Sequence, residues 1–325
     1  MTPDADRRWM AAALALARRG RGRTGSNPNV GCLLLQGSRV VGRGWTQDGG
    51  RPHAEAMALT EAGSRAQGAI AYVTLEPCAH ESRRGPACAD SLIAAGIARC
   101  VVAMADPDER TAGKGLARLK AAGVETVSGV LEAEARLELA GFVGRLATGR
   151  AELTLKLALS LDGRLAMADG RSQWITGEAA RLYAHQLRAE ADMVLVGGGT
   201  LRADRPRLDN RLPGSHAPQP LKAVLTSGPV PEGFLAFCDL QALEHFARQE
   251  GLNRILCEGG GGLASALLTM NRVDRLLLLR APILIGEGIG LEGLHPATLA
   301  ETHGVWRLEE RRPLGADLLE RYRLM

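Results

Sequence analysis

The sequence predicts an α/β protein made of two domains, each with a β-sheet covered by helices. The chain has 325 residues, which is enough for two domains at roughly 150 residues each. Short β-rich runs alternate with helical stretches along its whole length, a rhythm that indicates parallel or mixed sheets. The alternation restarts near residue 147. We therefore expect one domain over residues 1–147 and a second over residues 148–325.

The first domain should contain a mixed sheet. An amphipathic helix over residues 1–20 precedes two β-rich runs, 30–36 and 39–45, whose two-residue turn at Gly37-Ser38 is typical of a hairpin. The elements that follow alternate as helix, strand, helix, strand, helix, strand and helix, at residues 53–63, 70–75, 89–96, 100–104, 113–123, 124–129 and 131–146. Two of these helices end at a glycine, Gly96 and Gly123, which is a common helix stop.

The second domain should contain a mostly parallel sheet. Strands are expected in six segments: 153–163, where a turn follows the strand, 192–200, where the strand runs into a glycine loop, 221–228, where a loop follows the strand, a run beginning at 254, 273–286 and 315–324. Helices are expected at 177–190, at 240–251 and after the glycines that follow residue 257. Strands that alternate with helices in this way imply right-handed crossovers and parallel pairing.

The composition is that of an ordinary globular protein, with 46% hydrophobic and 23% charged residues. The net charge of +4 is spread along the chain, so it indicates no nucleic-acid partner but suits a phosphorylated small molecule. No stretch reaches the roughly 18 apolar residues of a membrane helix, and the N-terminal helix lacks the features of a signal peptide. We expect a cytoplasmic protein without a membrane partner, in which some of the six cysteines bind metal rather than form disulfides.

Four residues of the first domain form a candidate zinc site. His53 and Glu55 open an expected helix, Cys78 follows Pro77 at a strand end, and Cys88 lies at the start of the next helix. One imidazole and two thiolates leave a fourth zinc position open for water, as in catalytic sites. Glu55 could then move a proton from that water to a leaving amine. The pattern H-x-E with P-C and a later cysteine is that of zinc deaminases, although here nine residues separate the cysteines.

Other interpretations of these residues are a surface histidine with two buried cysteines, or a structural zinc site with His80 as fourth ligand. Cys32 and Cys100 lie in expected strands and are interpreted as core residues. Asn27 and Asn29 could hydrogen-bond the edge of a pyrimidine, or could simply form a turn.

Two glycine runs in the second domain, 196–200 and 258–262, follow expected strands. Glycine lets backbone N–H groups approach a diphosphate, although each run taken alone is equally typical of a tight turn. Both runs lie at strand C-termini, which favours a ligand site. Four arginines follow the first run and suit a sugar phosphate or the extra phosphate of NADP, or else form a solvated basic loop: Arg202, Arg205, Arg207 and Arg211.

Together these motifs resemble one family, the bifunctional riboflavin-biosynthesis proteins, which join a pyrimidine deaminase to a pyrimidine reductase. The matching segments run in order along nearly the whole chain: NPNVG, PHAE, TLEPCAH, LSLDGR, SQWIT, GGGTLRAD, EGGG and APILIG. The resemblance implies a cytidine-deaminase-like first domain and a dihydrofolate-reductase-like second domain. It also implies hydrolysis of the 2-amino group of 2,5-diamino-6-ribosylamino-4(3H)-pyrimidinone 5′-phosphate, followed by NADPH reduction of the ribosyl group to the ribitylamino product.

The resemblance also implies roles for individual residues. His53, Cys78 and Cys88 would hold one Zn²⁺ per chain, with Glu55 as proton shuttle. Contacts with NADP are implied for Ala158, Trp174, Thr200, Asp204, Ser227, Gly260, Gly261, Gly262, Leu263, Ala264, Ser265 and Ala266. Contacts with substrate are implied for Ser172, Arg188, Leu208, Arg211 and Glu258, and Lys156, on the same strand as Ala158, is a candidate polar partner of the ribose.

The resemblance and the Leu-rich final strands suggest a homodimer through the second domain. One alternative is a nucleic-acid deaminase, which would need stacking aromatics, whereas the chain has four Trp, four Phe and three Tyr. A zinc-stabilised binding protein without turnover, or a chain with one inactive half, are further alternatives.

Overall fold

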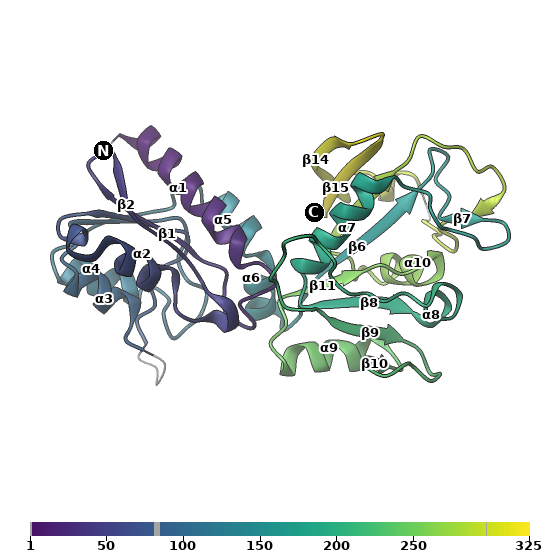
Figure 1. Cartoon of the computed structure of the whole chain (residues 1–325), viewed down its shortest axis with the longest axis horizontal. Helices are drawn as coiled ribbons and strands as arrows, with labels where there is room; N and C mark the ends of the chain where they lie inside the picture. The colour runs from purple at the N-terminus through teal and green to yellow at the C-terminus, as the bar shows by residue number, and fades with distance from the viewer. Residues whose placement is uncertain (1, 81–84, 297) are drawn as a thin grey trace. The chain divides into compact units, whose positions relative to one another are not determined.

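The computed structural model describes residues 2–80, 85–296 and 298–325. The chain forms two compact units, Met1–Gly149 and Arg150–Met325, and each is an α/β unit with its own sheet (Figure 1). The expected fold class is confirmed. The expected boundary at residue 147 lies within the last turn of helix α6 (Ala140–Thr148), and the structural division follows the end of that helix.

The first unit has a mixed five-stranded sheet in the order β2-β1-β3-β4-β5. The strands are β1 (Gly31–Gln36), β2 (Arg39–Trp45), β3 (Ile70–Val73), β4 (Arg99–Val102) and β5 (Glu125–Ser128). β1 pairs antiparallel with both β2 and β3, whereas β3, β4 and β5 are parallel. The expected hairpin is present, and Gly37 in its turn has a φ of 58°, a conformation that favours glycine.

The helices of this unit are α1 (Pro3–Ala17), α2 (Ala54–Ala62), α3 (Cys88–Ala94), α4 (Lys114–Ala121), α5 (Glu132–Glu138) and α6, with short 3₁₀ turns at Arg18–Gly20, Asp48–Gly50 and Gly63–Ala66. The single helix expected over 131–146 is wrong. It divides at Leu139, whose φ of −97° and ψ of 13° leave the helical region while its side chain stays in the core.

Glycines on the β1-β2 hairpin let α1 and α2 pack directly against the strands. A Cβ at Gly31 would lie 2.0 Å from the carbonyl oxygen of Ala13 in α1, and one at Gly44 would lie 2.0 Å from that of Ala54 in α2. Any larger residue at Gly44 would push the first turn of α2 away from β2. This packing fixes where α2 begins, and so where His53 lies.

The second unit has an eight-stranded sheet in the order β10-β9-β8-β11-β6-β12-β15-β14. Its strands are β6 (Glu152–Leu159), β8 (Met193–Gly197), β9 (Leu221–Leu225), β10 (Phe234–Phe237), β11 (Arg254–Cys257), β12 (Arg275–Arg280), β14 (Trp306–Leu314) and β15 (Asp317–Leu324). Pairing is parallel from β10 to β12 and antiparallel for β12-β15 and β15-β14. The expected mostly parallel sheet is therefore confirmed.

The remaining elements of this unit are α7 (Glu178–Ala189), α8 (Gly198–Asp204), α9 (Leu240–Gln249), α10 (Gly261–Thr269), a 3₁₀ turn at Ala300–Thr302, and the small strand pair β7 (Ala166–Met167) and β13 (Gly288–Ile289). The loop expected at 196–200 is wrong, because α8 begins at Gly198 directly after β8. β10 and β14 were not expected, since neither strand has a buried run: three of the four β10 residues and all nine of β14 are partly or fully exposed.

Within the described part of the chain, no helix is long and apolar enough to cross a membrane.

A buried ion pair fastens α1 to the first sheet. Asp6 accepts hydrogen bonds from Tyr72 Oη at 2.7 Å and from Arg99 Nη1 and Nη2, each at 2.9 Å. Burial by itself would raise the pKa of Asp6, but the bonds from Arg99 and Tyr72 outweigh it and hold that pKa below its ordinary value.

We expect Asp6→Asn to lower the free energy of unfolding by about 2 kcal/mol at pH 7, because charged hydrogen bonds to Arg99 are lost. Since the folded pKa of Asp6 is depressed, its contribution is fully present above the unfolded pKa of about 3.9 and is lost as pH falls toward the folded pKa. Urea unfolding of the wild-type protein and of the Asp6→Asn variant should therefore show a constant difference in the free energy of unfolding down to about pH 4. This difference should shrink at lower pH. A difference that persists unchanged at pH 2.5 would contradict this account.

Candidate active sites

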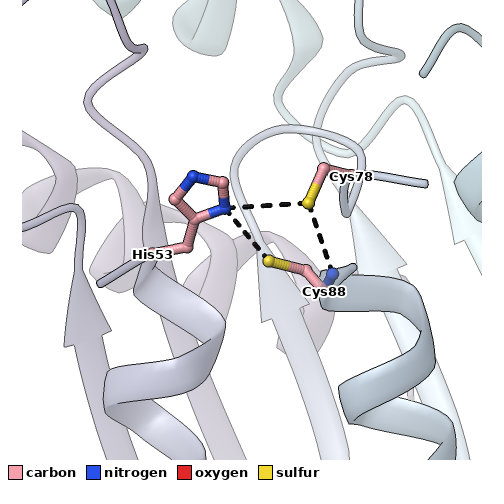
Figure 2. A group of neighbouring side chains, drawn as sticks. All are labelled: His53, Cys78 and Cys88. Carbon is pink, nitrogen blue, oxygen red and sulfur yellow. Dashed lines mark hydrogen bonds between the residues drawn. The ribbon is translucent and has the colours of Figure 1, made fainter. Parts of the chain in front are cut away.

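Three element ends bring the expected metal ligands together in the first unit. His53 is the residue before α2, Cys78 lies in the loop after β3, and Cys88 is the first residue of α3. His53 Nδ1 lies 3.1 Å from Cys88 Sγ and 3.7 Å from Cys78 Sγ, and the backbone N–H of Cys88 donates to Cys78 Sγ at 3.3 Å (Figure 2). The three candidate ligand atoms lie within 4.8 Å of one another.

The donor set fits a catalytic zinc ion, because it offers one nitrogen and two sulfurs and leaves a position free. His80, the fourth ligand of the structural alternative, is not in the cluster found among the described residues. Its Nδ1 lies 3.3 Å from Thr111 Oγ1 instead. The geometry therefore favours an open metal site over a closed structural one.

The two thiols have different acidities. The neighbouring Cys88 thiol and the imidazole of His53 lower the pKa of Cys78, against the opposing effect of burial. Hydrogen bonding to Cys78, together with burial, raises the pKa of Cys88. The pair thus favours a thiolate at Cys78, which is the form that binds metal.

Glu55 lies in the first turn of α2 and is 3% exposed. Burial raises the pKa of its carboxyl above the ordinary value, while His53 opposes that rise. Glu55 lines a cavity of about 340 Å³ together with His53 and Cys78. A buried carboxyl with a raised pKa that faces the same cavity as a metal site is suited to proton transfer.

The two asparagines differ in position. Asn27 lines the cavity, between Ser26 and Pro28. Asn29 is not part of the lining: its Nδ2 donates to the carbonyl oxygen of Ala17 at 3.2 Å and to Glu138 Oε1 at 2.8 Å. The structure therefore places Asn27, but not Asn29, where a substrate could contact it.

Several other residues of this cavity were not expected from the sequence: Arg51, Glu76, Asp106, Asp108, Arg110, Phe142, Arg145 and Leu146. Glu76 lies inside the TLEPCAH segment, but its residue type did not indicate where its carboxylate points. The last three come from α6, which had shown no motif. Cys32 and Cys100 are fully buried in the core, as expected.

A second cavity, of about 450 Å³, lies in the second unit. Lys156 and Ala158 face it from β6, where Leu155, Leu157 and Leu159 point to the core. Predicted residues that line the cavity are Lys156, Ala158, Ser172, Trp174, Arg188, Thr200, Asp204, Leu208, Arg211 and Glu258. Ser227 and the 260–266 run are not part of this lining, although Gly260 N donates to Thr200 Oγ1 at 3.0 Å.

A buried charge cluster forms one wall of this cavity. Arg188 donates to Glu258 at 2.6 and 3.0 Å, and Lys156 Nζ lies 3.9 Å from Glu258 Oε2. Burial favours a neutral Glu258, but the two cations outweigh it and hold the pKa of Glu258 below its ordinary value. Burial lowers the pKa of Lys156, which Glu258 partly offsets. Each group thus depends on the others for its charge.

The four arginines that follow the first glycine run are only partly free to bind an anion. Arg205, Arg207 and Arg211 line the cavity, whereas Arg202 does not. Arg207 and Arg211 both pair with Asp209, at 2.9 and 2.8 Å. A bound phosphate would therefore compete with Asp209 for these two side chains.

Comparison with known proteins matches a family model to each of the two units. Residues 3–104 match the cytidine and deoxycytidylate deaminase zinc-binding region, and residues 151–311 match the RibD C-terminal domain. The riboflavin biosynthesis protein RibD of Escherichia coli is 39% identical over 96% of this chain and 98% of its own length. The chain belongs to the RibD family. RibD of Mycobacterium tuberculosis H37Rv is also 39% identical, over 95% of each chain.

Solved RibD structures share the fold over the whole length. Acinetobacter baumannii RibD superposes with a TM-score of 0.90 at 35% identity, covering 100% of both chains. The Thermotoga maritima diaminohydroxyphosphoribosylaminopyrimidine deaminase/5-amino-6-(5-phosphoribosylamino)uracil reductase superposes with a TM-score of 0.90 at 27% identity over 99% of both chains. As a member of this family, the chain is a bifunctional enzyme of riboflavin biosynthesis, with a deaminase domain and a reductase domain.

In the reductase domain, Glu258→Gln should lower the free energy of unfolding by about 3 kcal/mol, because it leaves Arg188 and Lys156 buried without their counter-ion. Urea unfolding at pH 7 measures this loss. The same substitution at the exposed Glu232 is the matched control and should change stability by less than about 0.5 kcal/mol. Equal unfolding midpoints for the two variants would show that the cluster does not stabilise the domain.

Proposed function

We propose that the deaminase domain hydrolyses the 2-amino group of 2,5-diamino-6-ribosylamino-4(3H)-pyrimidinone 5′-phosphate, with zinc held by His53, Cys78 and Cys88. The observation that carries this proposal is the cluster of one imidazole and two thiols, of which His53 and Cys78 line the same cavity as Glu55. A zinc ion there would supply an activated water molecule for attack on the ring carbon that bears the amino group.

The protein residues have separate tasks in this proposal. Glu55 takes a proton at its carboxyl and returns it to the departing amine, so that ammonia leaves as a neutral molecule. Its burial supports this role, because burial raises the pKa of the carboxyl above its ordinary value and so makes it a better proton acceptor. Asn27 is in position to hydrogen-bond the pyrimidine edge. The buried ring of Phe142 in the cavity lining would keep water from part of the site and strengthen these polar contacts.

In the reductase domain, we propose that NADPH supplies a hydride to the ribosyl carbon of the deaminated product. Ala158, Trp174, Thr200 and Asp204 would contact the cofactor, and Ser172, Arg188, Leu208, Arg211 and Glu258 the substrate. All nine line one cavity, which supports the assignment. Lys156 would contact the ribose, since it lies on the same strand face as Ala158. Ser227 and residues 260–266 would contact the cofactor beyond this cavity.

We also propose a cytoplasmic homodimer assembled through the reductase domain. β14 ends the eight-stranded sheet, and within the described chain its outer edge has no strand partner. A second copy could cover such an edge. All six cysteines are free, as expected in a reducing compartment.

Glu55→Gln should abolish ammonia release, with a loss of at least about 100-fold in kcat, because an amide cannot carry the proton. The variant should retain zinc, since the three ligands are untouched. Ammonia release and metal content, measured on the same preparation, test both statements. A zinc-loaded Glu55→Gln protein that still deaminates would exclude Glu55 as the proton carrier.

The order of the two reactions can be measured with the intact chain and the diaminopyrimidine ribosyl phosphate. We expect ammonia release without NADPH, and NADPH oxidation only after deamination has produced its substrate. Zinc removal by a chelator should stop both signals, whereas the deaminated substrate added directly should restore NADPH oxidation. NADPH oxidation that precedes ammonia release would reverse the proposed order.

A further inference from the structure

The buried carboxylate of Glu76 lies two residues before the candidate metal ligand Cys78. Glu76 is 2% exposed and belongs to the lining of the deaminase cavity. Its backbone is held at the sheet, because Glu76 N donates to the carbonyl oxygen of Met104 at 3.0 Å. The side chain therefore starts from a fixed point beside the proposed metal site.

The Glu76 carboxylate accepts three hydrogen bonds from backbone N–H groups far along the chain. Asp106 N and Gly113 N donate to Oε2 at 3.2 and 2.9 Å, and Leu116 N donates to Oε1 at 3.0 Å. Gly113 is the residue before α4, and it has no side chain that could accept hydrogen bonds from the first turn of the helix. Glu76 thus takes the role of an N-cap for α4, where the helix dipole also favours a negative charge.

Two of these bonds, from Asp106 N and Gly113 N, hold the ends of one segment, residues 106–113, and the third holds the first turn of α4. Three side chains of this segment, Asp106, Asp108 and Arg110, line the deaminase cavity. Inside the segment, Asp108 N donates to Asp106 Oδ1 at 2.9 Å, and Arg110 N donates to Asp108 Oδ1 at 2.9 Å. Because these bonds make the segment a single unit, its position relative to the cavity depends on how its two ends are held.

A second contact ties α4 to the same strand end. A Cβ at Gly115 would lie 2.0 Å from the carbonyl oxygen of Pro77. The first turn of α4 therefore lies directly against the residue that precedes Cys78. The carboxylate and this close contact together set the distance between the 106–113 segment and the metal ligand.

We propose that Glu76 is a positioning residue of the deaminase: it holds residues 106–113 so that their side chains face the substrate beside the metal site. The inference rests on the proposed deaminase function. A purely structural Glu76 would also stabilise the domain, so stability alone does not distinguish the two roles. Substrate affinity does, because only a positioning residue controls contacts in the cavity.

Steady-state ammonia release by the full-length, zinc-loaded Glu76→Gln variant tests the proposal. An amide is uncharged and replaces one acceptor oxygen with a donor, so at least one of the bonds from Asp106 N, Gly113 N and Leu116 N is lost. We expect KM for the diaminopyrimidine ribosyl phosphate to rise by about tenfold or more, with a smaller change in kcat and unchanged zinc content. NADPH oxidation with the deaminated substrate should keep its wild-type KM and serves as the internal folding control.

The matched control is Asp6→Asn, which also removes a buried carboxylate from this unit but one that does not line the cavity. It should lower the melting temperature and leave the deamination KM within about twofold. If Glu76→Gln lowers the melting temperature but keeps the wild-type KM at full zinc occupancy, the proposal is overturned.

If Glu76→Gln does not fold, the Glu76→Asp variant is measured instead, because aspartate keeps the negative charge on a shorter side chain. A KM raised several-fold would support the proposal, and an unchanged KM would overturn it. A wild-type chain that releases no ammonia would instead refute the proposed function itself, which separates the two failures.

Discussion

The deaminase site depends on one constraint: the start of α2, the end of β3 and the start of α3 must meet within a few ångströms. Metal ligand bonds are about 2.0–2.3 Å long, so three donors from different elements leave little tolerance. Two close contacts maintain this meeting point. Gly44 lets α2 lie on β2, and Gly115 lets α4 lie on Pro77. A single methyl group at either glycine would displace a ligand-bearing segment.

The same meeting point explains why the polar groups are buried there. Helix N-termini expose N–H groups that need acceptors, and α3 and α4 begin beside Cys78 and Glu76. The Cys88 N–H is taken by the sulfur of Cys78, and the N–H groups at the start of α4 are taken by Glu76. The same side chains thus accept hydrogen bonds from the helix N-termini and shape the site. Stability and chemistry are therefore closely linked in this domain.

In the reductase domain, the buried charges of the cavity wall pair with one another. Glu258 follows β11, Lys156 lies on β6 and Arg188 on α7, so the cluster joins two neighbouring strands to a covering helix. Two cations around one carboxylate leave net positive charge in the cavity wall. Such a wall suits an anionic ligand, in keeping with a phosphorylated substrate and a dinucleotide.

The sequence by itself determined the two-domain α/β class, the family and the candidate ligands His53, Cys78 and Cys88. These features are local: a helix start, a strand end and a periodic pattern are each visible within a few residues. Only the tertiary structure decided which polar side chains face a cavity. Asn29 bonds to Glu138 instead of lining the site, Gly198 and Gly199 begin a helix instead of a loop, and Glu76 reaches backbone groups 30 to 40 residues away. Contacts over such separations depend on how whole elements pack, which neither residue type nor spacing encodes.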